Sequence, residues 1–166
     1  SDCFRAEEGH YVSQEAAIEQ TECEAGTYAN ERGSSECKLA DPGHYVGSMA
    51  AAAQTACAPG EYQPQSSQTS CLTTEAGHQN PDIGSTDMIP CEAGNYQHET
   101  GRTYCLAADP GSYVPTSAAT DQIECPAGTY SQESASTSCI DADAGYYIPE
   151  SGSTDQIECL AGTYSS

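Results

Sequence analysis

The stretch "CPAGTYSQESASTSC", from Cys125 to Cys139, decides the fold of this chain, because nearly the same phrase returns along its 166 residues. The phrase begins and ends with a cysteine and holds a Gly-x-Tyr between them, and it stands also at 23–37, 57–71 and 91–105. Repeated units of this size seldom bury enough surface alone, so neighbouring units are expected to stabilise one another. The sequence therefore predicts a repeat protein.

Two periods are nested in the sequence. A longer and a shorter gap between consecutive cysteines alternate strictly along the chain, which gives a 34-residue repeat. A glycine also recurs at half that period, and a tyrosine stands two residues after it in every case but Gln79. The chain is thus one continuous array over 1–166 of 17-residue half-modules. The 34-residue repeats run approximately over 3–36, 37–70, 71–104, 105–138 and the incomplete 139–166.

The half-modules are of two kinds, and the difference bears on the disulfides. One kind has Cys three residues before the glycine and eleven after it, whereas the other has Ala and Gln there, as at Ala40 and Gln54. Cysteines that come and go together behave as a bonded pair. This favours the pairs Cys23–Cys37, Cys57–Cys71, Cys91–Cys105 and Cys125–Cys139. The alternative, which closes the longer gaps as in Cys3–Cys23 and Cys37–Cys57, uses all ten cysteines, and spacing alone does not exclude it.

The composition predicts a small disulfide-rich fold with mostly β or irregular structure. There is no Trp and only one Phe, so disulfides made outside the cell replace a large core. Turn sequences such as "ADPG" (Ala40–Gly43) precede the Gly-x-Tyr, where glycine allows positive φ or close chain approach. We expect an elongated tandem-repeat rod of short β-hairpins with almost no helix. Two apolar rows are expected to make the contacts between modules: Val12, Val46, Val114 and Ile148 after the tyrosines, and Leu39, Leu72, Leu106 and Ile140 after the cysteines.

The phrases "CEAGTYANERGSSEC", "CAPGEYQPQSSQTSC" and "CEAGNYQHETGRTYC" resemble known extracellular modules. They are similar to the first module of tumour-necrosis-factor-receptor cysteine-rich repeats and to ephrin-receptor-like cysteine-rich repeats. The resemblance covers the whole chain as five copies, and it implies a disulfide between the two cysteines of each phrase. The chain departs from those families in the second half-module, as in "IDADAGYYIPESGSTDQIE" (Ile140–Glu158), which has no cysteine. The resemblance therefore implies a rod outside the cell, but no particular ligand.

Charge and residue pattern exclude several classes of function. Four basic against 25 acidic residues give a formal charge of −21, which repels nucleic acid and anionic membranes. The longest apolar run, Met49–Ala53, is far too short to span a bilayer. The ionisable residues recur with the repeat and offer no pair of nucleophile and base, so neither an enzyme nor a small-molecule substrate is expected.

Several candidate sites follow the repeat. Three histidines after the glycine, His10, His44 and His78, are interpreted as exposed turn residues rather than metal ligands. Acids two residues before the glycine are interpreted as turn caps, with Ca²⁺ as the alternative. These acids are Glu7, Asp41, Glu75, Asp109 and Asp143, and the calcium candidates are Asp41, Asp109, Asp141 and Asp143 with Asp121. No Asn-x-Ser/Thr sequon exists, and the candidates for O-linked sugars are Ser66, Ser67, Thr69, Ser131, Ser134 and Ser136.

The regular array predicts a structural role outside the cell or at its surface, as a fibre, filament, stalk or spacer. Under the favoured pairing, Cys3 and Cys159 lack partners within the chain. They then join different subunits head to tail, or they bond to residues of a longer array. The alternative is a ligand-binding or adhesive receptor-like ectodomain. The third copy, with Gln79, Asn80–Pro90 and Tyr104, is its best candidate for a binding site.

Overall fold

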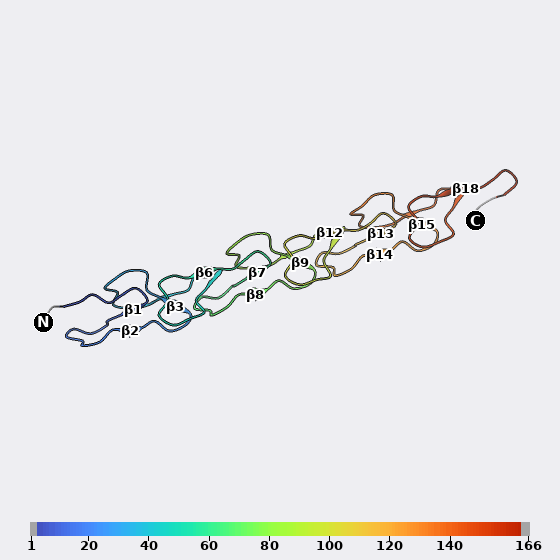
Figure 1. The fold of residues 1–166 in the computed structure, drawn as a ribbon. Coiled ribbons are helices and arrows are strands. Elements are labelled where there is room, and N and C mark those ends of the chain that lie inside the picture. The colour runs from blue at the N-terminus through green and yellow to red at the C-terminus, as the bar shows by residue number, and fades with distance from the viewer. Residues whose placement is uncertain (1–2, 164–166) are drawn as a thin grey trace. The chain divides into compact units, whose positions relative to one another are not determined.

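All regular structure in the described part of the chain, residues 3–163 of the computed structural model, consists of two-residue β-strands. The strands pair in nine antiparallel hairpins, which confirms the expected fold of disulfide-rich hairpin modules (Figure 1). The hairpins are β1 (His10–Tyr11) with β2 (Thr21–Glu22), β3 (Thr27–Tyr28) with β4 (Lys38–Leu39), β5 (His44–Tyr45) with β6 (Thr55–Ala56), β7 (Glu61–Tyr62) with β8 (Leu72–Thr73), β9 (His78–Gln79) with β10 (Ile89–Pro90), β11 (Asn95–Tyr96) with β12 (Leu106–Ala107), β13 (Ser112–Tyr113) with β14 (Ile123–Glu124), β15 (Thr129–Tyr130) with β16 (Ile140–Asp141), and β17 (Tyr146–Tyr147) with β18 (Ile157–Glu158).

The chain divides into two compact units, which follow the same rules. Unit 1 comprises Ser1–Thr74 with Asn80–Met88, and unit 2 comprises Glu75–Gln79 with Ile89–Ser166. Strands β1 to β8 therefore belong to unit 1, and β9 to β18 belong to unit 2. Each unit is described by itself below.

A tight turn at the repeated glycine starts every hairpin. In unit 1 the backbone N–H of His44 donates to the carbonyl of Asp41 at 3.0 Å, and Gly43 between them has φ of +79°. This turn needs a positive φ at its third residue and favours proline at its second, which is Pro42 here. The N–H of Cys57 then donates back to the Gly43 carbonyl at 2.9 Å. Cys57 stands just before the turn of the next hairpin, so the residue that closes one hairpin leads directly into the next.

A second left-handed residue lies in each hairpin loop, seven residues after the turn glycine. All nine loops have positive φ there, although only four of these residues are glycine. The residues are Ala16, Gly33, Ala50, Ser67, Gly84, Gly101, Ala118, Ala135 and Gly152. The period of the turn glycines did not predict this position. The signal that could have found it is the restriction of the position to Gly, Ala and Ser.

Backbone hydrogen bonds connect each hairpin to the next one along the chain. In unit 1 the N–H of Gly26 donates to the carbonyl of Val46 at 2.8 Å. In unit 2 the N–H of Gly94 donates to the carbonyl of Val114 at the same distance. In both units the donor is the turn glycine, and the acceptor follows the next Gly-x-Tyr. These bonds depend on the backbone and so survive variation of the side chains.

Each hairpin also reaches the next but one. In unit 2 the N–H of Ala118, the left-handed residue of its loop, donates to the carbonyl of Cys91 at 2.8 Å. The left-handed residue Gly152 lies so close to Gly111 that a Cβ added to Gly111 would sit 2.2 Å from the Gly152 carbonyl oxygen. Glycine is therefore required at this position for two reasons. Its φ is positive, and a distant stretch of backbone lies where a Cβ would be.

The core of each unit is a narrow row of small and polar side chains. It contains the residue three before most turn glycines, such as Cys125 or Ala108, and the residue after most Gly-x-Tyr turns, such as Val114, whereas Val12, Ala142 and Cys159 are only partly buried. At several positions directly after a Gly-x-Tyr turn, or after the equivalent Gln79, the buried residue is polar: Gln63, Asn80, Gln97 and Ser131. Gln97 shows how they are satisfied: its Nε2 donates to the Tyr104 carbonyl at 2.8 Å and its Oε1 accepts from the Glu99 N–H at 3.1 Å. These side chains tie down their own loops from inside.

The second apolar row expected from the sequence does not form contacts of a core. Leu39, Leu72 and Ile140 are exposed and only Leu106 is half-buried, so the assignment of this row as a ladder between modules is wrong. Leu72 stands directly opposite Tyr62 in the hairpin, and Ile140 stands opposite Tyr130. Residues that stand directly opposite one another in a hairpin share a face, and on that face the tyrosine is the more buried partner: Tyr130 is 8% exposed and Ile140 is 53% exposed.

The close approach of backbone to the turn glycine predicts that alanine substitution lowers stability by different amounts at two glycines of unit 2. Replacing Gly111 with alanine should destabilise the fold by about 1–3 kcal/mol more than replacing Gly128, because only Gly111 would force its Cβ into backbone. Both glycines have nearly the same φ, +85° and +89°, and Gly128 has no atom within 4 Å of an added Cβ. Urea unfolding of Gly111→Ala and Gly128→Ala measures the difference. Equal losses of stability would contradict the packing described here.

Candidate functional site

Four disulfides close alternate hairpins. They are Cys23–Cys37, Cys57–Cys71, Cys91–Cys105 and Cys125–Cys139, the pairs expected from the joint gain and loss of cysteines. Their Cα–Cα distances are 5.7 to 5.8 Å, within the normal range for a disulfide. The first cysteine of each pair is completely buried. Closing a loop of this length stabilises a fold by about 3 kcal/mol in the chain-entropy account.

Three of the five described hairpins without cysteine are closed by a hydrogen-bonded clasp at the equivalent place. In unit 1, Oε1 of Gln54 accepts from the backbone N–H of Asp41 at 2.7 Å, and its Nε2 donates to Asp41 Oδ2 at 2.8 Å. Gln122 and Asp109 repeat both bonds in unit 2, and so do Gln156 and Asp143. The glutamine thus does by hydrogen bonding what the cysteine does covalently in the alternate hairpins.

The clasp accounts for three of the five acids in the stripe seen in the sequence. Asp41, Asp109 and Asp143 accept from glutamine side chains, a partner that the interpretation as turn caps had not identified. Within the described residues no group of three or more His, Cys, Asp or Glu lies close enough to hold a metal ion. The calcium candidates Asp41, Asp109, Asp141 and Asp143, with Asp121, are therefore not brought together into such a group.

The histidines that follow the turn glycine take part in local turn contacts. Nδ1 of His10 lies 3.2 Å from the Glu8 carbonyl oxygen, and Nδ1 of His44 lies 3.3 Å from that of Pro42. His78 repeats the contact with Ala76 at 3.2 Å. Each ring thus contacts a carbonyl of its own turn, two residues back.

The third copy departs from the others at four places of the repeat. Gln79 replaces tyrosine, Asn80 replaces the β-branched residue, Met88 replaces the clasp glutamine, and Thr74 replaces the small Ala that precedes the turn. Asn80 donates through Nδ2 to the carbonyls of Glu61 and Asp87, both at 3.1 Å. The hydroxyl of Thr74 is buried without a hydrogen-bond partner. This hairpin has neither a cysteine pair nor the clasp glutamine.

Two cysteines carry no disulfide. Cys3 is exposed, and Cys159 is partly exposed although the equivalent cysteines Cys23, Cys57, Cys91 and Cys125 are completely buried. Cys159 lines a groove of about 830 Å³ in unit 2, together with Tyr147, Ile157 and Leu160. The groove therefore has a lining of mixed polarity, with Glu158 and Thr163 beside these apolar side chains, and it carries a thiol.

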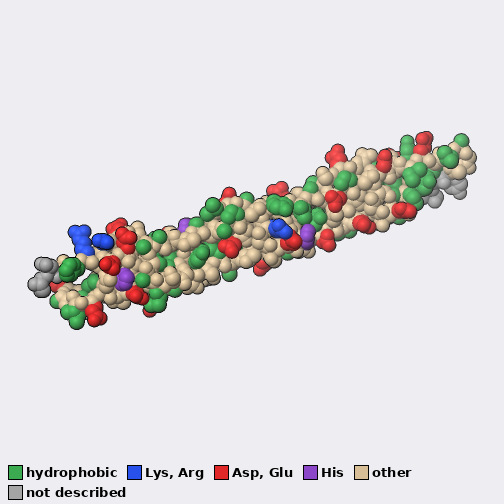
Figure 2. Space-filling model, viewed as in Figure 1, with side chains coloured by type: hydrophobic (Ala, Val, Ile, Leu, Met, Phe, Trp, Pro, Cys, Tyr) green, Lys and Arg blue, Asp and Glu red, His purple; other side chains and the backbone are tan. Residues whose placement is uncertain are grey.

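The visible surface is strongly acidic. Figure 2 shows Asp and Glu side chains spread over it, and basic side chains near the N-terminal end. Three of the four basic residues, Arg5, Arg32 and Lys38, lie in the first quarter of the sequence. The described residues contain no helix of the length and hydrophobicity needed to cross a membrane.

Comparison with known proteins gives no assignment. No protein-family model matches the chain, and no match was found among curated proteins. The geometry of the modules is thus the basis for the proposals below.

The equivalence of clasp and disulfide predicts that one can replace the other. The double substitution Ala108→Cys with Gln122→Cys puts cysteines at the two places that hold Cys91 and Cys105 in the preceding hairpin. We expect a fifth disulfide, detected by non-reducing peptide mapping, and a higher midpoint of urea unfolding. The substitution Gln122→Met, which copies Met88, should instead lower stability by about 1 kcal/mol or more. Free thiols at 108 and 122 in folded protein would refute the equivalence.

The buried hydroxyl of Thr74 predicts a stabilising substitution. Thr74→Ala should raise the unfolding free energy by about 1 kcal/mol, because it removes a polar atom without a partner and restores the residue found at Ala40 and Ala108. The reverse change Ala40→Thr, in the same unit, should destabilise. If Thr74→Ala lowers stability as much as Ala40→Thr does, the hydroxyl has a role in holding this hairpin.

Proposed function

We propose that this chain is a structural protein outside the cell, a rod-like protomer or segment of a surface fibre, filament or stalk. The observation that carries the proposal is the junction between hairpins, which repeats with the same hydrogen bonds in both units. A junction made by backbone groups extends an array without requiring any particular side chain. Regular assembly of identical junctions is the property that a fibre requires.

The disulfides and the surface support the extracellular setting. Eight of the ten cysteines are paired in internal disulfides, and such bonds persist in oxidising compartments. The acidic surface keeps individual chains soluble. In this proposal no half-module has a catalytic role, because the ionisable side chains belong to the repeated turns and clasps.

A second candidate function is an adhesive or ligand-binding ectodomain. The observation that favours it is the concentration of four departures in the third copy, where Ile83 is also exposed in the loop. A binding site in an otherwise uniform array requires such a local irregularity. The buried Asn80 serves its own loop, however, so the irregularity is partly one of packing.

The structural proposal predicts covalent and visible assembly. Boiled, non-reduced protein should run as a ladder of multiples of 17.3 kDa and collapse to one band on reduction, because Cys159 of one copy bonds to Cys3 of the next. Negative-stain electron microscopy of the native material should show long uniform fibres. Short single particles, with a monomer band and free thiols at Cys3 and Cys159, would favour the ectodomain instead.

A further inference from the structure

The hairpin of β9 and β10 is the one described hairpin that has neither a disulfide nor any bond of a clasp. At the two places that hold these closures in other hairpins, it has Thr74 and Met88. The Met88 side chain has no amide, and the Thr74 hydroxyl is buried without a hydrogen-bond partner. Even the first hairpin keeps half of a clasp, since Oε1 of Gln20 accepts from the Glu7 N–H at 2.9 Å.

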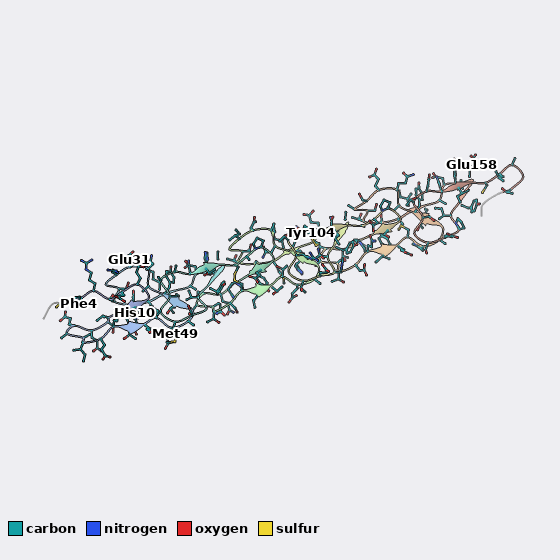
Figure 3. The ribbon with its side chains drawn as sticks, in the orientation of Figure 1. Phe4, His10, Glu31, Met49, Tyr104 and Glu158 are labelled. Carbon is teal, nitrogen blue, oxygen red and sulfur yellow. A yellow bond between two sulfur atoms is a disulfide. The ribbon has the colours of Figure 1, made fainter. Side chains whose placement is uncertain are left out.

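The loop of this hairpin presents a large apolar side chain to solvent. Ile83, six residues after the turn glycine, is 71% exposed. In the described hairpins the only other large apolar residue at this position is Met49, which is 58% exposed in the clasped hairpin of β5 and β6. Figure 3 shows Met49 pointing outward from the ribbon. Both loops belong to unit 1, so they can be compared directly.

The two loops are held by equivalent backbone bonds. The N–H of Gly84 donates to the Cys57 carbonyl at 2.9 Å, and the N–H of Ala50 makes the equivalent bond at 2.8 Å. Within the described residues, the backbone groups of Ile83 and Met49 themselves take part in no hydrogen bond. The main difference between the loops is therefore the clasp.

Two side-chain bonds tie the loop of Ile83 to its own backbone. Asn80 donates to the Asp87 carbonyl at 3.1 Å, and the Ser85 hydroxyl donates to the Asp82 carbonyl at 2.9 Å. Gln63 makes the equivalent of the first bond in a hairpin that also has a disulfide. Bonds of this kind therefore accompany a closure elsewhere and do not replace it.

The arrangement of the disulfides gives a break in this loop a particular result. Each of the four disulfides lies within a single hairpin, two of them before residue 74 and two after residue 90. A break in the loop of a disulfide-closed hairpin leaves the two pieces of chain joined. A break within 80–88 separates them, because none of the four disulfides spans this loop.

The missing closure affects how readily a protease can cut the loop. A protease binds its substrate as an extended segment, so a folded loop must open locally before it is cut. When closing is faster than cutting, the rate of cutting follows the fraction of molecules in which the loop is open. Two hydrogen bonds of ordinary strength change that fraction about tenfold or more. Exposed loop tips are in any case the preferred places for such cuts.

We propose that the loop 80–88 is a processing site, at which an extracellular endoprotease binds Ile83 in an apolar pocket and hydrolyses the Asp82–Ile83 bond. One water adds across that peptide bond, which leaves a carboxylate on Asp82 and an amino group on Ile83. The products are residues 1–82 and 83–166, each with two disulfides. Processing here rests on the proposed function for its extracellular setting alone, and it does not require a fibre.

The test uses the full chain and thermolysin, a protease that cuts before large aliphatic residues. The reference protein carries Met49→Ile, so that the two loops present the same side chain in an unclosed and a clasped hairpin. A recognition variant also carries Ile83→Ser, which is the residue of the equivalent Ser66. Cuts before Ile18, which is exposed as well, shorten the N-terminal piece and are counted separately.

A closed variant of the reference protein adds Thr74→Cys with Met88→Cys, at the places that hold a cysteine pair in the preceding hairpin. Its matched control adds Ala108→Cys with Gln122→Cys, which puts a disulfide into a hairpin of unit 2 that already has a clasp. Peptide mapping checks the intended disulfides, and circular dichroism checks that each variant keeps the parent fold.

Mass spectrometry of brief digests should find cutting before Ile83 about tenfold or more faster than before residue 49 of the reference protein. The closed variant should slow the cut before Ile83 by at least as much, and the matched control should leave it unchanged. Ile83→Ser should remove this cut without changing the midpoint of urea unfolding. In native material, mass spectrometry should find chains that begin at Ile83.

Three results would each overturn the proposal. They are equal rates at the two loops of the reference protein, an unchanged rate in the closed variant, and native material without chains that begin at Ile83. Each result is separate from assembly. Fibres whose chains are intact at this loop would leave the proposed function standing alone, whereas monomers processed at Ile83 would leave the processing site standing without the fibre.

Discussion

The approach of two stretches of backbone at the turn glycine is the constraint on which the rest of each unit depends. A carbonyl from the hairpin after next lies where the Cβ of Gly43 or Gly111 would be. That contact requires a glycine with positive φ on one side and a left-handed loop residue on the other. Because both requirements fall at fixed places in each hairpin, the regular spacing is maintained by steric exclusion rather than by side-chain packing.

This backbone packing explains how a chain with so few large apolar residues folds. The buried row holds Ala, Cys and Val with polar residues such as Gln63 and Gln97, whose amides bond to their own loops. Small cores supply little free energy, so each hairpin needs a closure of its own. The disulfide and the Gln–Asp clasp supply it in alternation. The third copy has neither cysteine pair nor clasp glutamine in one hairpin, and there a buried asparagine holds the loop from inside.

The two kinds of closure also differ in how they resist unfolding, because the disulfide is covalent and the clasp is a reversible hydrogen bond. Disulfides hold alternate hairpins against any disturbance short of reduction. The clasps between Gln54 and Asp41, and between Gln122 and Asp109, are exposed and exchange with water. Local opening is therefore expected first in the clasped hairpins, while the disulfide-closed ones keep the register for their reclosure. An array of hairpins closed in this way can open locally while the disulfide-closed hairpins keep the order of the modules.

The sequence by itself determined the repeat, the hairpins and the absence of helix in the described residues, and it favoured the cysteine pairs that the structure then decided. These features depend on interactions within a single hairpin, so the spacing of Gly, Tyr and Cys records them directly. The tertiary structure decided which residues face inward. Leu72 and Ile140 have the apolar character of core residues, yet they are exposed, because the narrow row that each hairpin buries is filled by small and polar residues such as Ala108 and Gln97. The left-handed conformation of Ala118 was not predicted either, because its N–H bonds to the Cys91 carbonyl of another hairpin. The clasp of Gln122 with Asp109 lies within one hairpin, but the spacing of Gly, Tyr and Cys does not identify side-chain partners.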